Sequence, residues 1–134
     1  MAWSAGAILT AAQLNTYLPQ AWSTWTPTIT AASGTFTTVS GAGRYIQYGK
    51  TVVWSATITI TTAGTAAGAV LFTLPVNAQA ALGYIGDGRE TTSTGAALQV
   101  FTVAATTGRA IRYDDTTAIG SGRTLLLSGA YEAV

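Results

Sequence analysis

The carboxylates are the side chains of this sequence best suited to acid–base chemistry, and the adjacent pair is Asp114 and Asp115 in the stretch RYDDTT. Two carboxylates can serve a glycosidase, and carboxylate oxygens can also bind calcium. Neighbours on a strand point to opposite faces, so this pair can share one ligand only where the chain turns. Because Asp and Thr side chains bond to nearby backbone in turns, we expect DDTT to form a hairpin tip, with a hydrolase or calcium site as the alternative.

A second group of charges lies in IGDGRE, where Asp87 and Glu90 flank Arg89. Mixed charge over so few residues predicts an exposed strand or a bulge. The GDG triplet favours a tight turn or bulge with a positive φ, which glycine adopts without steric cost.

Other kinds of catalytic chemistry lack their usual residues. The sequence has no His and no Cys, which removes the usual general base near neutral pH, the thiolate nucleophile and common transition-metal ligands. Lys50 follows Gly49 in a predicted turn, and GAG before Arg44 leads into a strand pattern, whereas phosphate-binding glycine loops open a helix. We therefore expect no catalytic residue, no cofactor and no metal site.

Charge is scarce throughout the sequence. Charged residues make up 8% of it, against about 25% in typical domains, and the net charge is +1. The basic residues are scattered, so no stripe could neutralise several phosphates, and we expect no nucleic-acid partner. The sequence contains no run of about 18 apolar residues, so we expect no membrane span. A surface so poor in charge favours burial in an assembly, and we expect a homo-oligomer.

The first 43 residues contain no Asp, Glu, Lys or Arg. They nevertheless carry large apolar side chains, and an exposed arm of that kind would be sticky. The arm could fold back on its own domain, but we favour burial against sister chains or a larger particle. The predicted anchoring residues are Trp3, Ile8, Leu9, Leu14, Tyr17, Leu18, Trp22 and Trp25.

Within this arm, ILTAAQLNTYLP predicts a short helix. Thr10 and Gln13 have the spacing of a capping box, and Leu9 and Leu14 have that of a hydrophobic staple. Pro19 would end the helix. So short a helix does not persist alone in water, so we expect it to dock on another surface. The stretch that follows, from Gln20 to Phe36, looks like a connector.

The rest of the sequence reads as strands. In TVVWSATITITT, apolar residues alternate with Thr and Ser, and only Val53 breaks the period of two. GRYIQYGK is expected to be a hairpin that turns at Gly43 and Gly49 and precedes this strand. Further strands are predicted over 68–74, 82–90, 97–104, 109–113 and 124–132, separated by turn residues.

About eight short strands at this spacing predict an all-β fold, an antiparallel β-sandwich of jelly-roll type with a short N-terminal helix and an extended arm. The expected division is an anchoring arm over 1–26 and a β-sandwich over 27–134. Uncharged strand edges invite pairing, and a closed oligomer, which we expect to be a trimer, would remove them.

Two stretches resemble a known group of proteins. SAGAILTAAQLNTYL is similar to the opening of tail-associated and other virion proteins of phages that infect Gram-positive bacteria, and GRYIQYGKTVVWSATITI followed by FTLP resembles the pattern of their β domains. The resemblance implies a non-enzymatic, usually trimeric virion component on a tail or capsid surface. The sequence lacks a collagen-like or coiled-coil stalk, so a compact capsid decoration protein or a short tail appendage fits its size better than a full fibre.

The leading hypothesis is therefore a virion structural protein whose arm docks on other capsid or tail proteins. The alternative is a module that binds host cell-surface glycans. Trp54 is in phase with the buried face of its strand, so the candidate glycan contacts are Tyr45, Tyr48, Tyr84, Tyr113 and Tyr131. A hydrolase that uses Asp114 or Asp115 is a third, weaker alternative.

Overall fold

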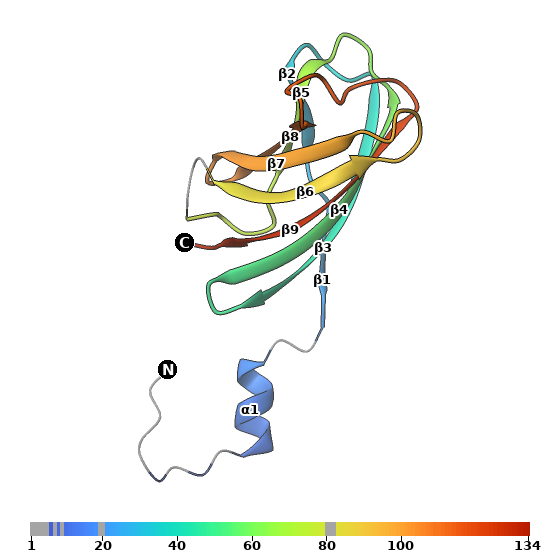
Figure 1. The fold of residues 1–134 in the computed structure, drawn as a ribbon. Helices are drawn as coiled ribbons and strands as arrows, with labels where there is room; N and C mark the ends of the chain where they lie inside the picture. The colour runs from blue at the N-terminus through green and yellow to red at the C-terminus, as the bar shows by residue number, and fades with distance from the viewer. Residues whose placement is uncertain (1–5, 7, 9, 19–20, 80–82) are drawn as a thin grey trace.

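The computed structural model describes Gly6, Ile8 and residues 10–18, 21–79 and 83–134. One helix, α1 (Ala11–Tyr17), precedes an antiparallel β-domain (Figure 1). The strands are β1 (Ser23–Trp25), β2 (Ile29–Ser33), β3 (Thr38–Tyr48), β4 (Thr51–Thr62), β5 (Ala67–Thr73), β6 (Tyr84–Glu90), β7 (Ala97–Ala104), β8 (Thr107–Arg112) and β9 (Arg123–Glu132). The predicted all-β, sandwich-like fold with a short N-terminal helix is confirmed.

The nine strands of the described residues belong to one curled sheet in the order β1-β3-β4-β9-β6-β7-β8-β5-β2 (Figure 1). The two edge strands are consecutive in the chain, so the segment from β1 to β2 crosses from one edge of the sheet to the other. Three hydrogen bonds fasten this crossing: Trp25 Nε1 donates to the Thr73 carbonyl (3.1 Å), Thr28 N to Thr73 Oγ1 (2.9 Å) and Thr73 N to the Thr28 carbonyl (3.1 Å). The predicted connector is therefore two edge strands, and the curl brings the two edges of the sheet together.

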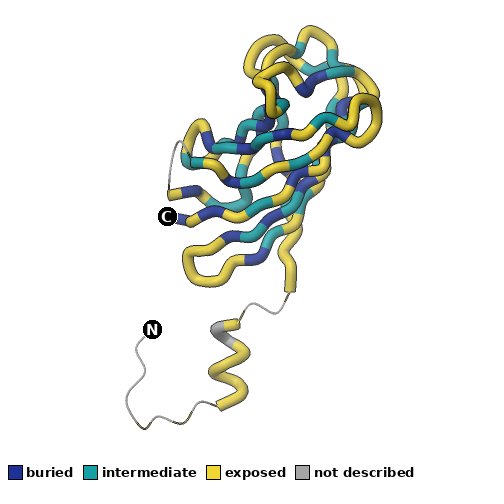
Figure 2. Tube along the Cα trace, viewed as in Figure 1, coloured by how far each residue is buried: buried dark blue, intermediate teal, exposed yellow. Residues whose placement is uncertain are grey.

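The core lies inside the curl (Figure 2). On β4 the even-numbered residues from Val52 to Ile60 are buried, and the intervening residues are exposed or half-buried, as the period of two predicted. Trp54 is the largest fully buried side chain, and its ring centroid lies 6.2 Å from that of Trp25 and 5.6 Å from that of Phe72.

Glycines make room for these rings. Gly43 pairs with Ala56 in the middle of β3, so the predicted turn at Gly43 is wrong. A Cβ at Gly43 would lie 2.1 Å from Cζ3 of Trp25, so only a residue without a side chain leaves space for that ring. The second predicted turn is confirmed, since Gly49 has a φ of 57° and connects β3 to β4 with Lys50.

Candidate interaction surface

Helix α1 is built as its sequence predicted. Thr10 Oγ1 accepts a hydrogen bond from the Gln13 amide (3.2 Å), and Gln13 Oε1 accepts one from the Thr10 amide (3.0 Å), which completes the capping box. The hydrophobic staple cannot be checked, because Leu9 lies outside the described residues, as does Pro19. These local bonds define where the helix begins, but they bury no apolar surface.

The apolar residues of the arm are exposed (Figure 2). The exposed fraction is 88% for Ile8, 46% for Leu14, 49% for Leu18 and 45% for Trp22. Trp3 and Leu9 lie outside the described residues, and so does the side chain of Tyr17. Every described anchoring residue that precedes β1 therefore remains available to another surface.

The two tryptophans at the base of the arm differ. Trp22 is exposed, and the guanidinium carbon of Arg44 lies 5.2 Å from its ring centroid, a cation–π contact on the outside of the sheet. Trp25 instead packs over Gly43 and beside Trp54 in the core of its own domain. Because β1 begins at Ser23, the sheet also starts earlier in the chain than the expected domain boundary at residue 27.

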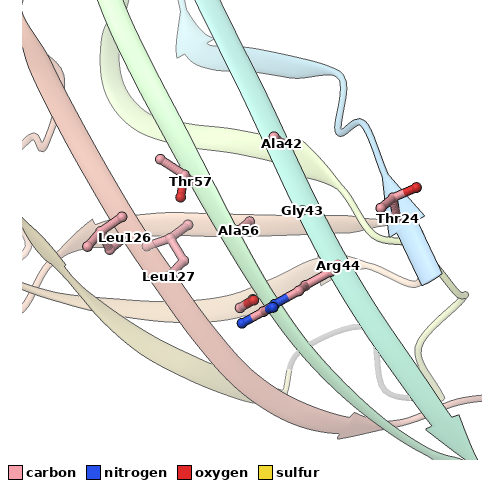
Figure 3. A pocket seen from close by; sticks show the side chains of 9 residues that line it. Thr24, Ala42, Gly43, Arg44, Ala56, Thr57, Leu126 and Leu127 are labelled. Atoms are coloured by element: carbon pink, nitrogen blue, oxygen red, sulfur yellow. The ribbon is translucent and has the colours of Figure 1, made fainter. Parts of the chain in front are cut away.

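A shallow hollow of about 420 Å³ lies next to this base, on the outer face of the sheet (Figure 3). Thr24 of β1 borders one side of it and Leu126 of β9 borders the other, while β3 and β4 run between them. The strand register places six side chains of the lining on this outer face: Thr24, Ala42, Arg44, Ser55, Thr57 and Leu126.

Side-chain size explains the hollow. Ala42, Ser55 and Thr57 have small side chains, whereas Leu126 stands on one side of the hollow and the longer side chain of Arg44 reaches from β3 across β4. Leu126 is 46% exposed, an unusual position for a leucine in the centre of a ten-residue strand. Arg44 is the only charged residue of the lining, so the hollow suits an apolar or neutral partner better than an ion.

The adjacent carboxylates form part of a turn, as predicted, but the turn is not a hairpin tip, because the strands before and after it, β8 and β9, are not neighbours in the sheet. Asp114 Oδ1 accepts hydrogen bonds from the Thr116 amide (3.0 Å) and hydroxyl (2.5 Å), and the hydroxyl bond, followed by the amide bond, lowers the Asp114 pKa. Asp115 has a φ of 60° and accepts a hydrogen bond from Gln99 Nε2 (2.8 Å). The two carboxylates thus have separate structural partners.

Glu90 differs from the prediction, because it is fully buried rather than part of an exposed strand. Its carboxylate accepts hydrogen bonds from the amides of Thr92 (2.7 Å), Ser93 (2.8 Å) and Thr94, and from the Thr94 hydroxyl (2.6 Å). Burial by itself raises the Glu90 pKa, but these donors outweigh burial and lower that pKa from 4.5 to about 2. Glu90 therefore holds the turn between β6 and β7 in place.

The register between β6 and β7 shifts between Tyr84 and Gly86, at the start of the GDG triplet, which agrees with the predicted bulge, but neither Gly86 nor Gly88 has the predicted positive φ. Gly86 faces Gly129 on β9, and a Cβ at Gly86 would lie 2.2 Å from the Ser128 carbonyl oxygen. Gly86 therefore also allows β6 and β9 to approach closely, which the sequence did not predict.

The tyrosines proposed as glycan contacts separate into two sets. Tyr48, Tyr84 and Tyr113 are exposed, whereas Tyr45 is half-buried and Tyr131 is buried. Burial raises the pKa of Tyr131 to about 12, although the hydrogen bond that the Val76 amide donates to the Tyr131 hydroxyl oxygen (3.3 Å) acts in the opposite direction. Three of the five therefore remain accessible to a ligand.

Within the described ranges, no group of three or more Asp, Glu, His or Cys side chains is placed to bind a metal ion. No helix in the same part of the chain is long and apolar enough to cross a membrane. Comparisons of this chain with protein-family models, with curated proteins and with solved structures gave no match.

The sequence analysis did not identify the hollow. Ser55 and Thr57 were assigned correctly to the polar face of their strand, but neither Ala42 nor Leu126 was singled out. One signal was present: Leu126 occupies the outward position between two core leucines in the run LLL, where a polar residue is expected.

Proposed function

We propose that this protein is a non-enzymatic structural subunit of a bacteriophage particle, and that its N-terminal arm attaches it to neighbouring subunits. The observation that carries this proposal is the exposure of Ile8, Leu14, Leu18 and Trp22 in a stretch without any charged residue. Among the described residues, the β-domain does not bury these four side chains. Another polypeptide could bury them, and that would remove their apolar surface from water.

Energetics support attachment through the arm. A seven-residue helix is too short to be stable alone in water, so docking would supply its stability. Full burial of each leucine would contribute roughly 1.5 to 3 kcal/mol. In a trimer, which we also propose, three arms would strengthen attachment through effective concentration without any new type of contact.

The assignment to a phage particle is supported by the resemblance of the helix region and of the β3–β4 hairpin to virion proteins. Both a capsid decoration protein and a tail appendage are compatible with a β-domain of this size. The absence of an enzymatic role is supported by the carboxylates, because Glu90 is used within a turn and Asp114 and Asp115 have separate local partners.

The test is the incorporation of full-length variants into particles. Leu14→Asp and Leu18→Asp place charge on the apolar side of α1, and we expect each to reduce the amount of the chain in purified particles at least tenfold, since roughly 1.4 kcal/mol corresponds to that factor. Ala12→Asp is the matched control, because it adds the same charge on the opposite side of the helix. If all three variants are incorporated equally, the arm is not the attachment element.

The second candidate function is recognition of host cell-surface glycans. The observation that favours it is the exposure of Tyr48, Tyr84 and Tyr113, whose rings could stack on sugars. Binding of the full chain to a glycan array or to host cell walls tests it, and loss of binding in Tyr84→Ala or Tyr113→Ala would support it. An absence of binding by the unchanged chain would exclude this function for the glycans tested.

A further inference from the structure

The hollow beside β1 and the exposed helix α1 have matching chemistry. The hollow contains Ala42, Ser55, Thr57 and Leu126, and its single charged residue, Arg44, already lies against the ring of Trp22. The helix has no charged residue and exposes Leu14 and Leu18. Each surface is therefore largely apolar, with one charge in the hollow and none on the helix, and neither is covered among the described residues.

The length of helix α1 also agrees with the width of the hollow. Seven helical residues at 1.5 Å per residue give a length of about 10 Å. The hollow crosses β3, β4 and β9, and two inter-strand spacings of about 4.8 Å give a width of about 10 Å. Small side chains in the hollow leave room for a leucine to enter, and Leu126 on one side of it offers an apolar contact.

The direction of β1 indicates which copy supplies the helix. Ser23 pairs with Tyr45 and Trp25 with Gly43, so the chain moves away from the level of Ala42 as it runs from β1 toward α1. Figure 1 shows α1 beyond the end of the β-domain. A return within the same chain would need a full reversal in the few residues between Leu18 and Ser23.

The geometry points to the α1 helix of a second copy of this chain as the occupant of the hollow, so that copies exchange arms. This inference rests on the proposed function, because it names the neighbouring polypeptide that covers the arm. An exchange in which each copy gives one helix and receives one forms a closed ring where the rotation between neighbouring copies closes.

Cysteine cross-linking tests this arrangement directly, because the natural sequence contains no cysteine. One full-length chain carries Leu14→Cys with an affinity tag, and the other carries Thr57→Cys. The control chain carries Thr106→Cys, an exposed threonine in the turn between β7 and β8, which contribute nothing to the hollow. Ala42→Cys is a second hollow variant, and the melting temperature of each chain reports whether it is folded.

We expect the mixed Leu14→Cys and Thr57→Cys chains to form a disulfide-linked species of twice the 13.7 kDa chain mass. Its rate of formation should exceed that of the Thr106→Cys control on the order of tenfold, because docking raises the effective concentration of the two thiols. Equal rates for the folded hollow variants and the control would overturn the inference. A double Leu14→Cys/Thr57→Cys chain that closes only on itself would overturn it too, since the occupant would then be its own arm.

These results separate the two proposals. If cross-linking to the hollow fails but Leu14→Asp still prevents incorporation into particles, the arm docks on a different protein and only the exchange is wrong. If Leu14→Asp also has no effect on incorporation, the proposed function fails as well.

Discussion

The arm and the β-domain of this protein are both poor in charge and rich in apolar residues, but the β-domain buries many of its apolar side chains, whereas the described ones of the arm before β1 are exposed. In the domain, Trp54 is fully buried, and Gly43 leaves space for the ring of Trp25. In the arm, Leu14 and Leu18 are nearly half exposed, although α1 has a complete capping box. Local hydrogen bonds can thus define an element without giving it a core, and apolar composition alone does not show which surface will cover it.

The difference arises from long-range pairing. The consecutive strands β1 and β2 occupy opposite edges of the sheet, so the short segment between them holds the two edges close to each other around the core rings. The described residues before β1 have no such pairing, and the stability of α1 depends on the surface on which it docks. Substitutions in one region, with the other region unchanged for comparison, can therefore separate the two contributions to stability.

The largest expected contrast is between Trp54→Ala and Leu14→Ala. Removing the buried indole should lower the free energy of unfolding by about 3–5 kcal/mol, because it leaves a cavity between Trp25 and Phe72. Leu14→Ala should change that free energy by less than about 0.5 kcal/mol, since its side chain packs on nothing in the domain. Denaturant titration of the full chain measures both, and a large loss for Leu14→Ala would show that the arm belongs to the domain core.

A smaller contrast is expected between two glycines. Gly43→Ala should cost about 1–3 kcal/mol, because the new Cβ would overlap the Trp25 ring and force it to move. Gly49→Ala meets no atom within 4 Å, so its cost of about 1 kcal/mol comes only from its positive φ. The same titration ranks the two variants, and a harmless Gly43→Ala would mean that Trp25 does not pack there.

Glu90 should give the domain a distinct pH dependence. Its folded pKa of about 2 lies below its ordinary value of 4.5, so its stabilising contribution is complete above pH 4.5 and is lost as the pH falls toward 2. Glu90→Gln should cost about 1–3 kcal/mol near neutral pH, because the amide presents only one acceptor to four donors. Its stability should also vary less with pH between 4.5 and 2, and an unchanged slope would contradict this role.

The smallest effect on the domain is expected from Thr10→Ala. Loss of the cap should destabilise the helix by about 0.5–2 kcal/mol and leave the melting temperature of the β-domain unchanged. Incorporation into particles should fall, because without the cap more free energy is needed to form the helix when it docks. Thr106→Ala, in the exposed turn between β7 and β8, is a control outside the helix; equal incorporation of the two variants would show that attachment does not need the helical form.

Sequence reasoning succeeded where the signal was local. The capping pair Thr10 and Gln13, the period-two pattern of β4 and the DDTT turn were all predicted from neighbouring residues. It failed where the answer depended on a partner distant in the chain. Gly43 resembles a turn residue until Trp25 is placed over it.

The hollow and Glu90 were missed for the same reason. Leu126 and Thr57 are adjacent only through the β4–β9 register, which no local pattern encodes. The burial of Glu90 depends on the amides of the following turn, which turn inward to meet its carboxylate. The strand order of the sheet could not be predicted from the sequence either, because several pairings of these uncharged strands are compatible with the same alternation of apolar and polar residues.

Amide hydrogen exchange across Ala11–Tyr17 tests most directly whether other chains cover the arm. In an isolated chain, held as a monomer by dilution, these amides should exchange at rates close to those of an unstructured peptide. In the assembled particle we expect protection comparable to that of the amides of β4. Equal and rapid exchange of the helix in both states would contradict the account, because the apolar arm would then remain in water after assembly.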